Sequence, residues 1–137
     1  MSIIESVDTF NKKIKYLVRV FKAKNGNTVS VESLWRRVRI ITNEMPLELI
    51  TRIGPKLWEQ REKINTRDEK FFLTDFDTGE IEANASTEVS TNEIKELINL
   101  IKQGYIGCTE SEKDKMYDAV KAMLDAYVVY LMKKRGL

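Results

Sequence analysis

The sequence predicts an all-α fold, an irregular bundle of four to five helices. Apolar residues recur with helical spacing in several segments, and four of these segments follow a pair of residues spaced like a helix-capping box. A chain of 137 residues is the size of one domain, and 42% hydrophobic with 32% charged residues is typical of a globular protein. We therefore expect a single helical domain over 1–137, with a basic amino-terminal half (1–73), an acidic loop (74–89) and a helical hairpin (90–137).

The first two predicted helices form the basic part of the chain. Ser2 and Glu5 have capping-box spacing and predict a helix from about Ile3 to Lys24. The tripeptide Asn25-Gly26-Asn27 predicts the turn that ends it. A second helix is predicted over about 30–43, with one apolar side formed by Leu34, Trp35, Val38 and Ile41.

A third helix is predicted to start at Pro46, since proline is tolerated in a first turn. We expect this helix to break at Gly54-Pro55, because Pro55 removes a backbone donor and Gly54 relaxes the chain. It should resume through Leu57 and Trp58. Both Trp58 and Trp35 keep helical register with apolar neighbours, which favours core positions.

An acidic segment separates the predicted helices of the two halves of the chain. Thr66 and Glu69 predict a short helix over about 67–73, with Phe71 and Phe72 in the core, and apolar periodicity then vanishes over 74–89. Two further capping boxes open helices over about 90–103, ended by Gly104, and over about 109–134; the boxes are Ser90 with Glu93 and Thr109 with Glu112.

The composition removes most enzyme chemistries. No histidine is present, which excludes Ser-His and Cys-His nucleophiles and the usual zinc sites. Cys108 is the only cysteine, so no intrachain disulfide can form, and a core thiol is the favoured interpretation over a reactive one. No glycine-rich phosphate loop occurs. We therefore predict a non-enzymatic protein without a cofactor or metal, with a carboxylate-based enzyme kept as a third alternative.

The acidic sequence Asp75-Phe76-Asp77-Thr78-Gly79 resembles two kinds of site only superficially. A calcium loop needs glycine at its sixth position and glutamate at its twelfth, where this chain has Glu80 and Ser86. Paired phosphoryl-transfer aspartates would need a parallel α/β domain, and no βαβ pattern occurs. An acidic turn is the favoured interpretation.

The charge is distributed unevenly along the chain. Residues 1–40 carry nine Lys or Arg against three acids, a net of +6, whereas residues 68–98 have nine acids against two lysines, a net of −7. The basic segment could bracket a phosphate backbone. The nucleic-acid-binding candidates are Lys12, Lys13, Lys15, Arg19, Arg36, Arg37 and Arg39. A solvated basic surface is the simpler alternative.

The final predicted helix contains five consecutive apolar or aromatic residues, from Tyr127 to Leu131. Such a run covers more than one side of a helix, so some of these side chains should face a partner or a second layer. The protein-binding candidates are Tyr127, Val128, Val129 and Tyr130.

Several segments together resemble small helical virion proteins, of the minor capsid type, from large nucleocytoplasmic DNA viruses. The segments are Trp35-Arg36-Arg37-Val38, Gly54-Pro55-Lys56-Leu57-Trp58, Arg67-Asp68-Glu69-Lys70-Phe71-Phe72 and Tyr127-Val128-Val129-Tyr130-Leu131. The resemblance implies a virion component that cements larger capsid subunits, and it assigns no role to individual residues.

The leading interpretation is a helical structural or interaction protein that contacts other proteins, capsid subunits or its own copies. The alternative is a nucleic-acid-binding accessory factor that uses the basic helices. No stretch reaches the ~20 apolar residues of a membrane span, and the start of the chain lacks the features of a signal peptide. We expect a cytoplasmic location, or the virion if the protein is viral.

Overall fold

The computed structural model describes residues 1–25, 29–76 and 90–136, and all regular structure in these ranges is helical. The segments are α1 (Ile3–Asn25), α2 (Val29–Glu44), α3 (Glu48–Glu59), α4 (Arg61–Asn65), the π-helix η1 (Phe71–Asp75), α5 (Thr91–Ile106) and α6 (Glu110–Lys134). The prediction of an all-α bundle is confirmed. Seven helical segments occur in the described ranges instead of four or five, because short segments follow α3. The turn at 26–28 and most of the predicted acidic loop, 77–89, lie outside the described residues.

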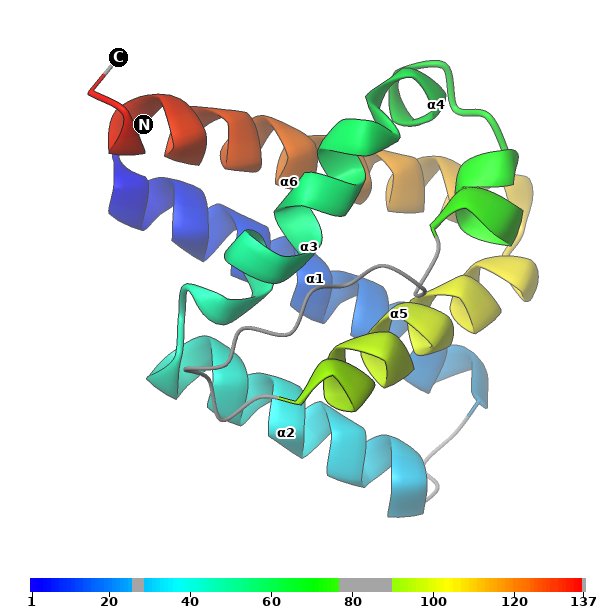
Figure 1. Cartoon of the computed structure of the whole chain (residues 1–137). Helices are drawn as coiled ribbons and strands as arrows, with labels where there is room; N and C mark the ends of the chain where they lie inside the picture. The colour runs from blue at the N-terminus through cyan, green and yellow to red at the C-terminus, as the bar shows by residue number, and fades with distance from the viewer. Residues whose placement is uncertain (26–28, 77–89, 137) are drawn as a thin grey trace.

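The two longest helices, α1 and α6, form the centre of the bundle (Figure 1). They lie side by side with opposed chain directions, so that the start of α1 and the end of α6 lie on the same side of the molecule. Helix α5 packs across α1, and α3 packs on α6. The face of α1 that these neighbours cover consists of Val7, Phe10, Ile14, Leu17, Val18 and Phe21, all buried. This face has the helical spacing expected of a core stripe.

Local sequence fixes three of the helix starts, as predicted. The Ser2 hydroxyl accepts from the Glu5 amide at 3.1 Å, and the Ser2 amide donates to the Glu5 carboxylate at 3.2 Å. Ser90 caps α5 by accepting from the Glu93 amide. A complete capping box, Thr109 with Glu112, opens α6. Each cap satisfies amides that the first helical turn leaves without partners.

The predicted break at Gly54-Pro55 is wrong, because α3 continues through both residues to Glu59. Pro55 leaves the Thr51 carbonyl without an amide donor. Thr51 and Pro55 are both exposed, so a water molecule can donate to this carbonyl instead. Gly54 is instead a packing position. A Cβ atom there would lie 2.6 and 2.7 Å from Cε1 and Cγ of Tyr127 in α6. The absence of a side chain at Gly54 therefore lets α3 cross closely over α6.

Gly104 does not end α5, which continues to Ile106 and is capped at Gly107. A Cβ atom on Gly104 would lie 3.2 Å from Cβ and 3.3 Å from Cα of Phe21 in α1. This glycine therefore permits a close approach of the two helix backbones. The prediction of a terminator failed because the residue serves the α1–α5 contact.

An aromatic cluster fills the space between η1, α5 and α6. Its rings belong to Phe71, Phe72, Phe76, Tyr105 and Tyr117, all buried. The ring of Phe72 stacks on that of Tyr105 with centroids 4.4 Å apart and meets that of Tyr117 edge-on at 5.1 Å. The predicted core role of the Phe71-Phe72 pair is confirmed.

The helical segment predicted over 67–73 starts later, at Phe71, and its predicted Thr66–Glu69 capping box is not formed. The Thr66 hydroxyl donates backward to the Glu62 carbonyl, at the end of α4. Arg67 then adopts a left-handed conformation with φ 54°, and its guanidinium contacts Asp118 and the Asp114 carbonyl of α6. These contacts with α6 hold a backbone conformation that ends a helix, so the next helical segment begins only at Phe71.

Two other predictions for this region are corrected. Trp58 is 45% exposed, because α3 turns that position away from the core, and the Arg61 guanidinium lies 4.2 Å from the centre of its ring. Pro46 lies in the turn before α3, which begins at Glu48. Among the described helices, none is long and apolar enough to cross a membrane.

Candidate nucleic-acid interface

Helices α1 and α2 enclose a basic cleft of about 500 Å3 on the surface of the bundle. Its lining residues are Lys12, Lys13, Lys15, Tyr16 and Arg19 from α1 and Trp35 and Arg39 from α2. The structure therefore brings together five of the seven basic residues that the sequence suggested. No lining residue is acidic, so every charged side chain in the wall of the cleft is positive.

Most of this positive charge is not neutralised by an ion pair within the described residues. Lys12 forms an ion pair with Asp8 at 2.9 Å, and both side chains are largely exposed. Within the described residues, Lys13, Lys15, Arg19 and Arg39 form no ion pair. Clustered like charges repel one another, and they raise the local concentration of an anionic ligand.

Two aromatic residues distinguish the cleft from an ordinary basic surface. The half-buried Trp35 packs in part against the core, and its ring has Arg19 at 5.9 Å and Lys22 at 5.8 Å from the ring centre. Both distances are near the outer limit for a cation–π contact.

The second aromatic residue is Tyr16. Burial, followed by the influence of Cys108 and Glu112, raises the pKa of its hydroxyl. This hydroxyl stays protonated at neutral pH and adds no negative charge to the cleft.

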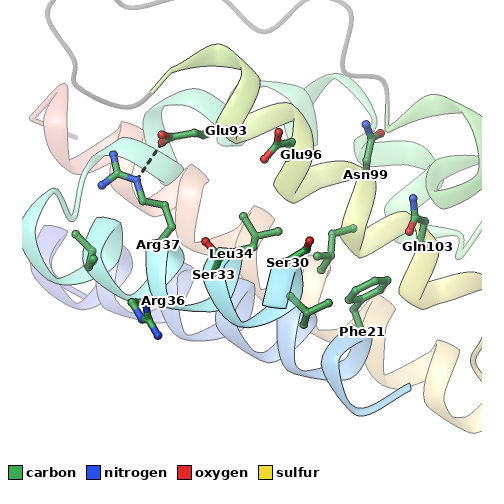
Figure 2. A pocket seen from close by; sticks show the side chains of 13 residues that line it. Phe21, Ser30, Ser33, Leu34, Arg36, Arg37, Glu93, Glu96, Asn99 and Gln103 are labelled. Atoms are coloured by element: carbon green, nitrogen blue, oxygen red, sulfur yellow. Dashed lines mark hydrogen bonds and ion pairs between the residues drawn. The ribbon is translucent and has the colours of Figure 1, made fainter. Parts of the chain in front are cut away.

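Arg36 and Arg37 lie elsewhere, although the sequence grouped them with the other basic candidates. Both line a larger groove of about 950 Å3 between α2 and α5 (Figure 2). In this groove Arg37 donates to Glu93 at 3.2 Å, and Glu96 adds another carboxylate to the wall. Acidic and basic side chains therefore face each other there. The mixed charge makes this groove unsuited to a polyanion.

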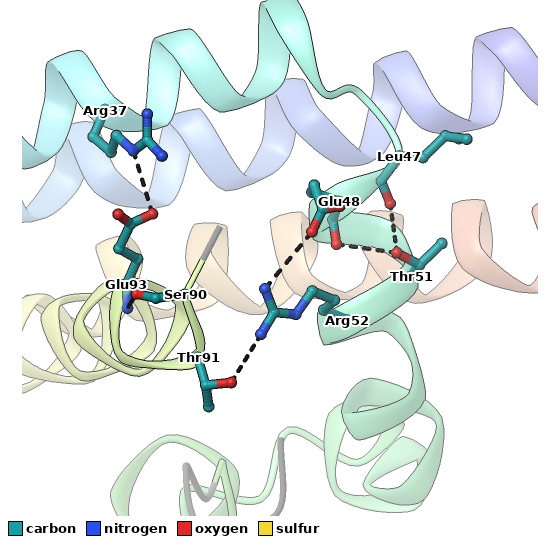
Figure 3. A network of polar contacts seen from close by, with 8 residues as sticks. All are labelled: Arg37, Leu47, Glu48, Thr51, Arg52, Ser90, Thr91 and Glu93. Atoms are coloured by element: carbon teal, nitrogen blue, oxygen red, sulfur yellow. Dashed lines mark hydrogen bonds and ion pairs between the residues drawn. The ribbon is translucent and has the colours of Figure 1, made fainter. Parts of the chain in front are cut away.

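A polar network fixes the start of α5 against α2 and α3 (Figure 3). Arg52 of α3 is buried, and it reaches Thr91 at 3.1 Å and the Glu48 carboxylate at 3.7 Å. Arg37 reaches Glu93 from the other side. These contacts hold α5 in place and so position the acidic wall of the α2–α5 groove.

The protein-binding candidates on α6 are less accessible than the sequence indicated. Tyr127 is 7% exposed and Tyr130 is 5% exposed, so both rings belong to the core. Tyr127 packs against Gly54 of α3, which explains its burial. Val128 and Val129 are half-buried. For Tyr127 the second layer is therefore provided by α3 within the same chain.

A different apolar surface, which the sequence analysis missed, lies at the start of α1. Ile3, Ile4 and Leu47 are exposed, Ile4 to 81%, and they line a hollow of about 260 Å3 together with Val7 and Pro46. The signal in the sequence was the Ser2 cap, which places two isoleucines in a first helical turn ahead of the buried stripe.

Cys108 and the acidic side chains complete the groups that the sequence analysis considered for chemistry. The Cys108 thiol donates to the Gly104 carbonyl at 3.2 Å, and burial raises its pKa, which disfavours the reactive thiolate. Within the described ranges, no group of three or more acidic or thiol side chains could hold a metal ion. Residues 77–79 of the acidic turn lie outside these ranges.

Comparison with known proteins gives no match: no family model, no curated protein and no solved structure is similar to this chain.

Proposed function

We propose that this chain is a non-enzymatic binding protein whose basic cleft between α1 and α2 binds the phosphate backbone of a nucleic acid. The main support is that five cationic side chains line the basic cleft and that none of its lining residues is acidic. Four of these cations have no ion-pair partner among the described residues, so they are available to phosphates.

The spacing of the cleft residues suits a short run of phosphates. Lys12, Lys15 and Arg19 lie one above the other on α1, and from Lys12 to Arg19 the helix rises about 10 Å, at roughly 1.5 Å per residue. At about 3.4 Å of axial rise per nucleotide, this length matches about three phosphates of one strand. Arg39 contributes from the facing helix.

The test is the salt dependence of oligonucleotide binding, measured by fluorescence anisotropy. Lys15→Ala and Arg39→Ala should each weaken binding and reduce the slope of log K against log salt by about 0.7 to 0.9 per lost phosphate contact. Arg36→Ala is the matched control, because Arg36 lies on the same helix but lines the other groove. If Arg36→Ala reduces the slope as much as Arg39→Ala does, the cleft is not the binding site.

A second candidate function is protein–protein contact, the leading interpretation of the sequence. It is supported by the exposed apolar side chains around the hollow at the start of α1, above all Ile4 and Leu47. Ile4→Glu and Leu47→Glu should abolish co-purification with a partner or self-association, measured by light scattering, with helicity unchanged. Ile106→Glu is the control at an exposed isoleucine elsewhere.

The resemblance to minor capsid proteins of large DNA viruses bears on this second candidate alone. In that case the partner is a capsid subunit, and the protein is part of the virion. Mass spectrometry of the native complex that contains the chain tests this proposal, and a partner set without capsid proteins contradicts it.

A further inference from the structure

We infer that the cleft between α1 and α2 selects single-stranded over double-stranded nucleic acid by stacking a base on Trp35; this inference rests on the proposed function of the same cleft. The observation is that an indole ring lines the same small hollow as five cations. The cations can hold a phosphate backbone of either kind of nucleic acid. The ring adds a contact that only an unpaired base can make.

The chemistry of the ring favours a single strand. Every base has a π-face that can stack on an aromatic side chain, and in a duplex these faces are covered by the neighbouring base pairs. A base that enters the cleft must therefore be unstacked. Combining a basic groove with an aromatic platform is how proteins bind single strands without reading their sequence.

The surroundings of Trp35 allow this exchange. Part of the ring packs on the core, which fixes its orientation, and it is only half-buried. The two cations over the ring, Arg19 and Lys22, lie near the limit of contact. A bound strand would draw the Arg19 guanidinium toward a phosphate and place a base over the ring, while Lys22 keeps its ion pair with Glu32 at 2.8 Å.

The α2–α5 groove provides an internal comparison. It is larger than the basic cleft, but its polar wall mixes Arg36 and Arg37 with Glu93 and Glu96, and the aromatic ring that lines it, Phe21, is buried. Carboxylates would repel the phosphates there. The preference for a single strand should therefore depend on residues of the α1–α2 cleft alone.

The experiment uses the intrinsic fluorescence of the full chain. The protein has two tryptophans, so Trp58→Phe, at an exposed position on α3, leaves Trp35 as the only indole reporter. This protein is titrated with oligothymidylate, oligouridylate, a mixed-sequence duplex and heparin. The oligonucleotides are about 20 nucleotides long, which exceeds the usual site of a single-strand-binding fold. The two single strands distinguish DNA from RNA, and heparin supplies negative charge without bases.

We expect either single strand to quench Trp35 and to bind more tightly than the duplex or heparin. Trp35→Leu should weaken single-strand binding by roughly 5- to 150-fold, the loss of one stacked base, with little effect on the duplex. Because Trp35 also contacts the core, circular dichroism must show that the variant is folded. Trp35→Phe, which keeps a smaller ring, should bind with intermediate affinity and keeps the test valid if Trp35→Leu unfolds.

The outcomes distinguish base stacking on Trp35 from phosphate binding in the basic cleft. If the duplex or heparin binds as tightly as the single strands, or if binding leaves Trp35 fluorescence unchanged, the stacking inference is overturned while phosphate binding stands. If none of the nucleic acids binds at low salt, the proposed function is overturned with it.

Discussion

Replacing Gly54 by alanine tests whether the close crossing of α3 over α6 depends on the missing side chain. Alanine has the higher helix propensity, and in an unconstrained helix interior this substitution would stabilise the protein by about 0.5 to 1 kcal/mol. Here the new Cβ would lie 2.6 Å from Cε1 of the buried Tyr127 ring. Forcing an extra carbon into a packed core costs about 1 to 3 kcal/mol.

The net expectation is that Gly54→Ala destabilises the fold by roughly 1 to 2 kcal/mol, which lowers the melting temperature by about 3 to 8 °C for a domain of this size. Urea unfolding followed by circular dichroism measures the change in the free energy of unfolding. The control is a double-mutant cycle with Tyr127→Ala, which removes the Cγ, Cδ1 and Cε1 atoms that the new Cβ meets. In that background Gly54→Ala should be neutral or stabilising. An equal loss of stability with and without the Tyr127 ring would refute the reasoning and indicate that the cost comes from the backbone of α3.

Three further predictions concern the second half of the bundle. Thr109→Ala removes the cap of α6 and should lower the free energy of unfolding by about 1 kcal/mol, measured by urea denaturation. Phe72→Ala should cost about 3 to 5 kcal/mol and weaken the near-ultraviolet dichroism, because a buried ring stacked on Tyr105 is lost. The hydrogen bond that the Lys24 ammonium donates, followed by the one from the Thr109 backbone amide, lowers the pKa of the Glu112 carboxyl from 4.5 to about 2. A lowered pKa means that the stabilisation is present above pH 4.5 and lost as the pH falls toward 2, so the stability difference between wild type and Glu112→Gln should shrink over that interval. A difference that stays constant from pH 6 to pH 2 would contradict this assignment.

Three of the helices that sequence alone predicted well, α1, α5 and α6, have local start signals that form as expected. Ser90 and Thr109 lie three residues before Glu93 and Glu112, and both caps form as expected. Such bonds join neighbours in the chain, so no knowledge of the tertiary structure is needed to predict them.

The predictions that failed depended on distant partners. Gly54 and Gly104 are each typical of a helix break or end, but their neighbours in space, Tyr127 and Phe21, are remote in sequence. Helical register likewise placed Trp58 on an apolar face without indicating that no neighbouring helix covers it. Periodicity specifies the face of a helix, whereas packing decides which faces become buried.

The candidate site was predictable only in part for the same reason. The spacing of Lys12, Lys15 and Arg19 puts them on one side of their helix whatever the fold. On α2, by contrast, Arg37 and Arg39 belong to different grooves, since one faces α5 and the other faces α1. The two arginines are separated because α5 and α1 pack on different sides of α2, and the sequence does not specify this arrangement.

The two glycine contacts impose different constraints on how this fold can diverge. The contact at Gly54 is with an aromatic side chain, so a homologue could carry a larger residue there if position 127 became smaller in the same lineage. The contact at Gly104 includes the Cα atom of Phe21 at 3.3 Å and its nitrogen at 3.4 Å, which every amino acid possesses. No exchange at position 21 removes these atoms, so a side chain at 104 requires the backbones of α1 and α5 to move apart by a few tenths of an ångström. Homologues of this chain should therefore show paired variation at 54 and 127, and a preference for glycine at 104.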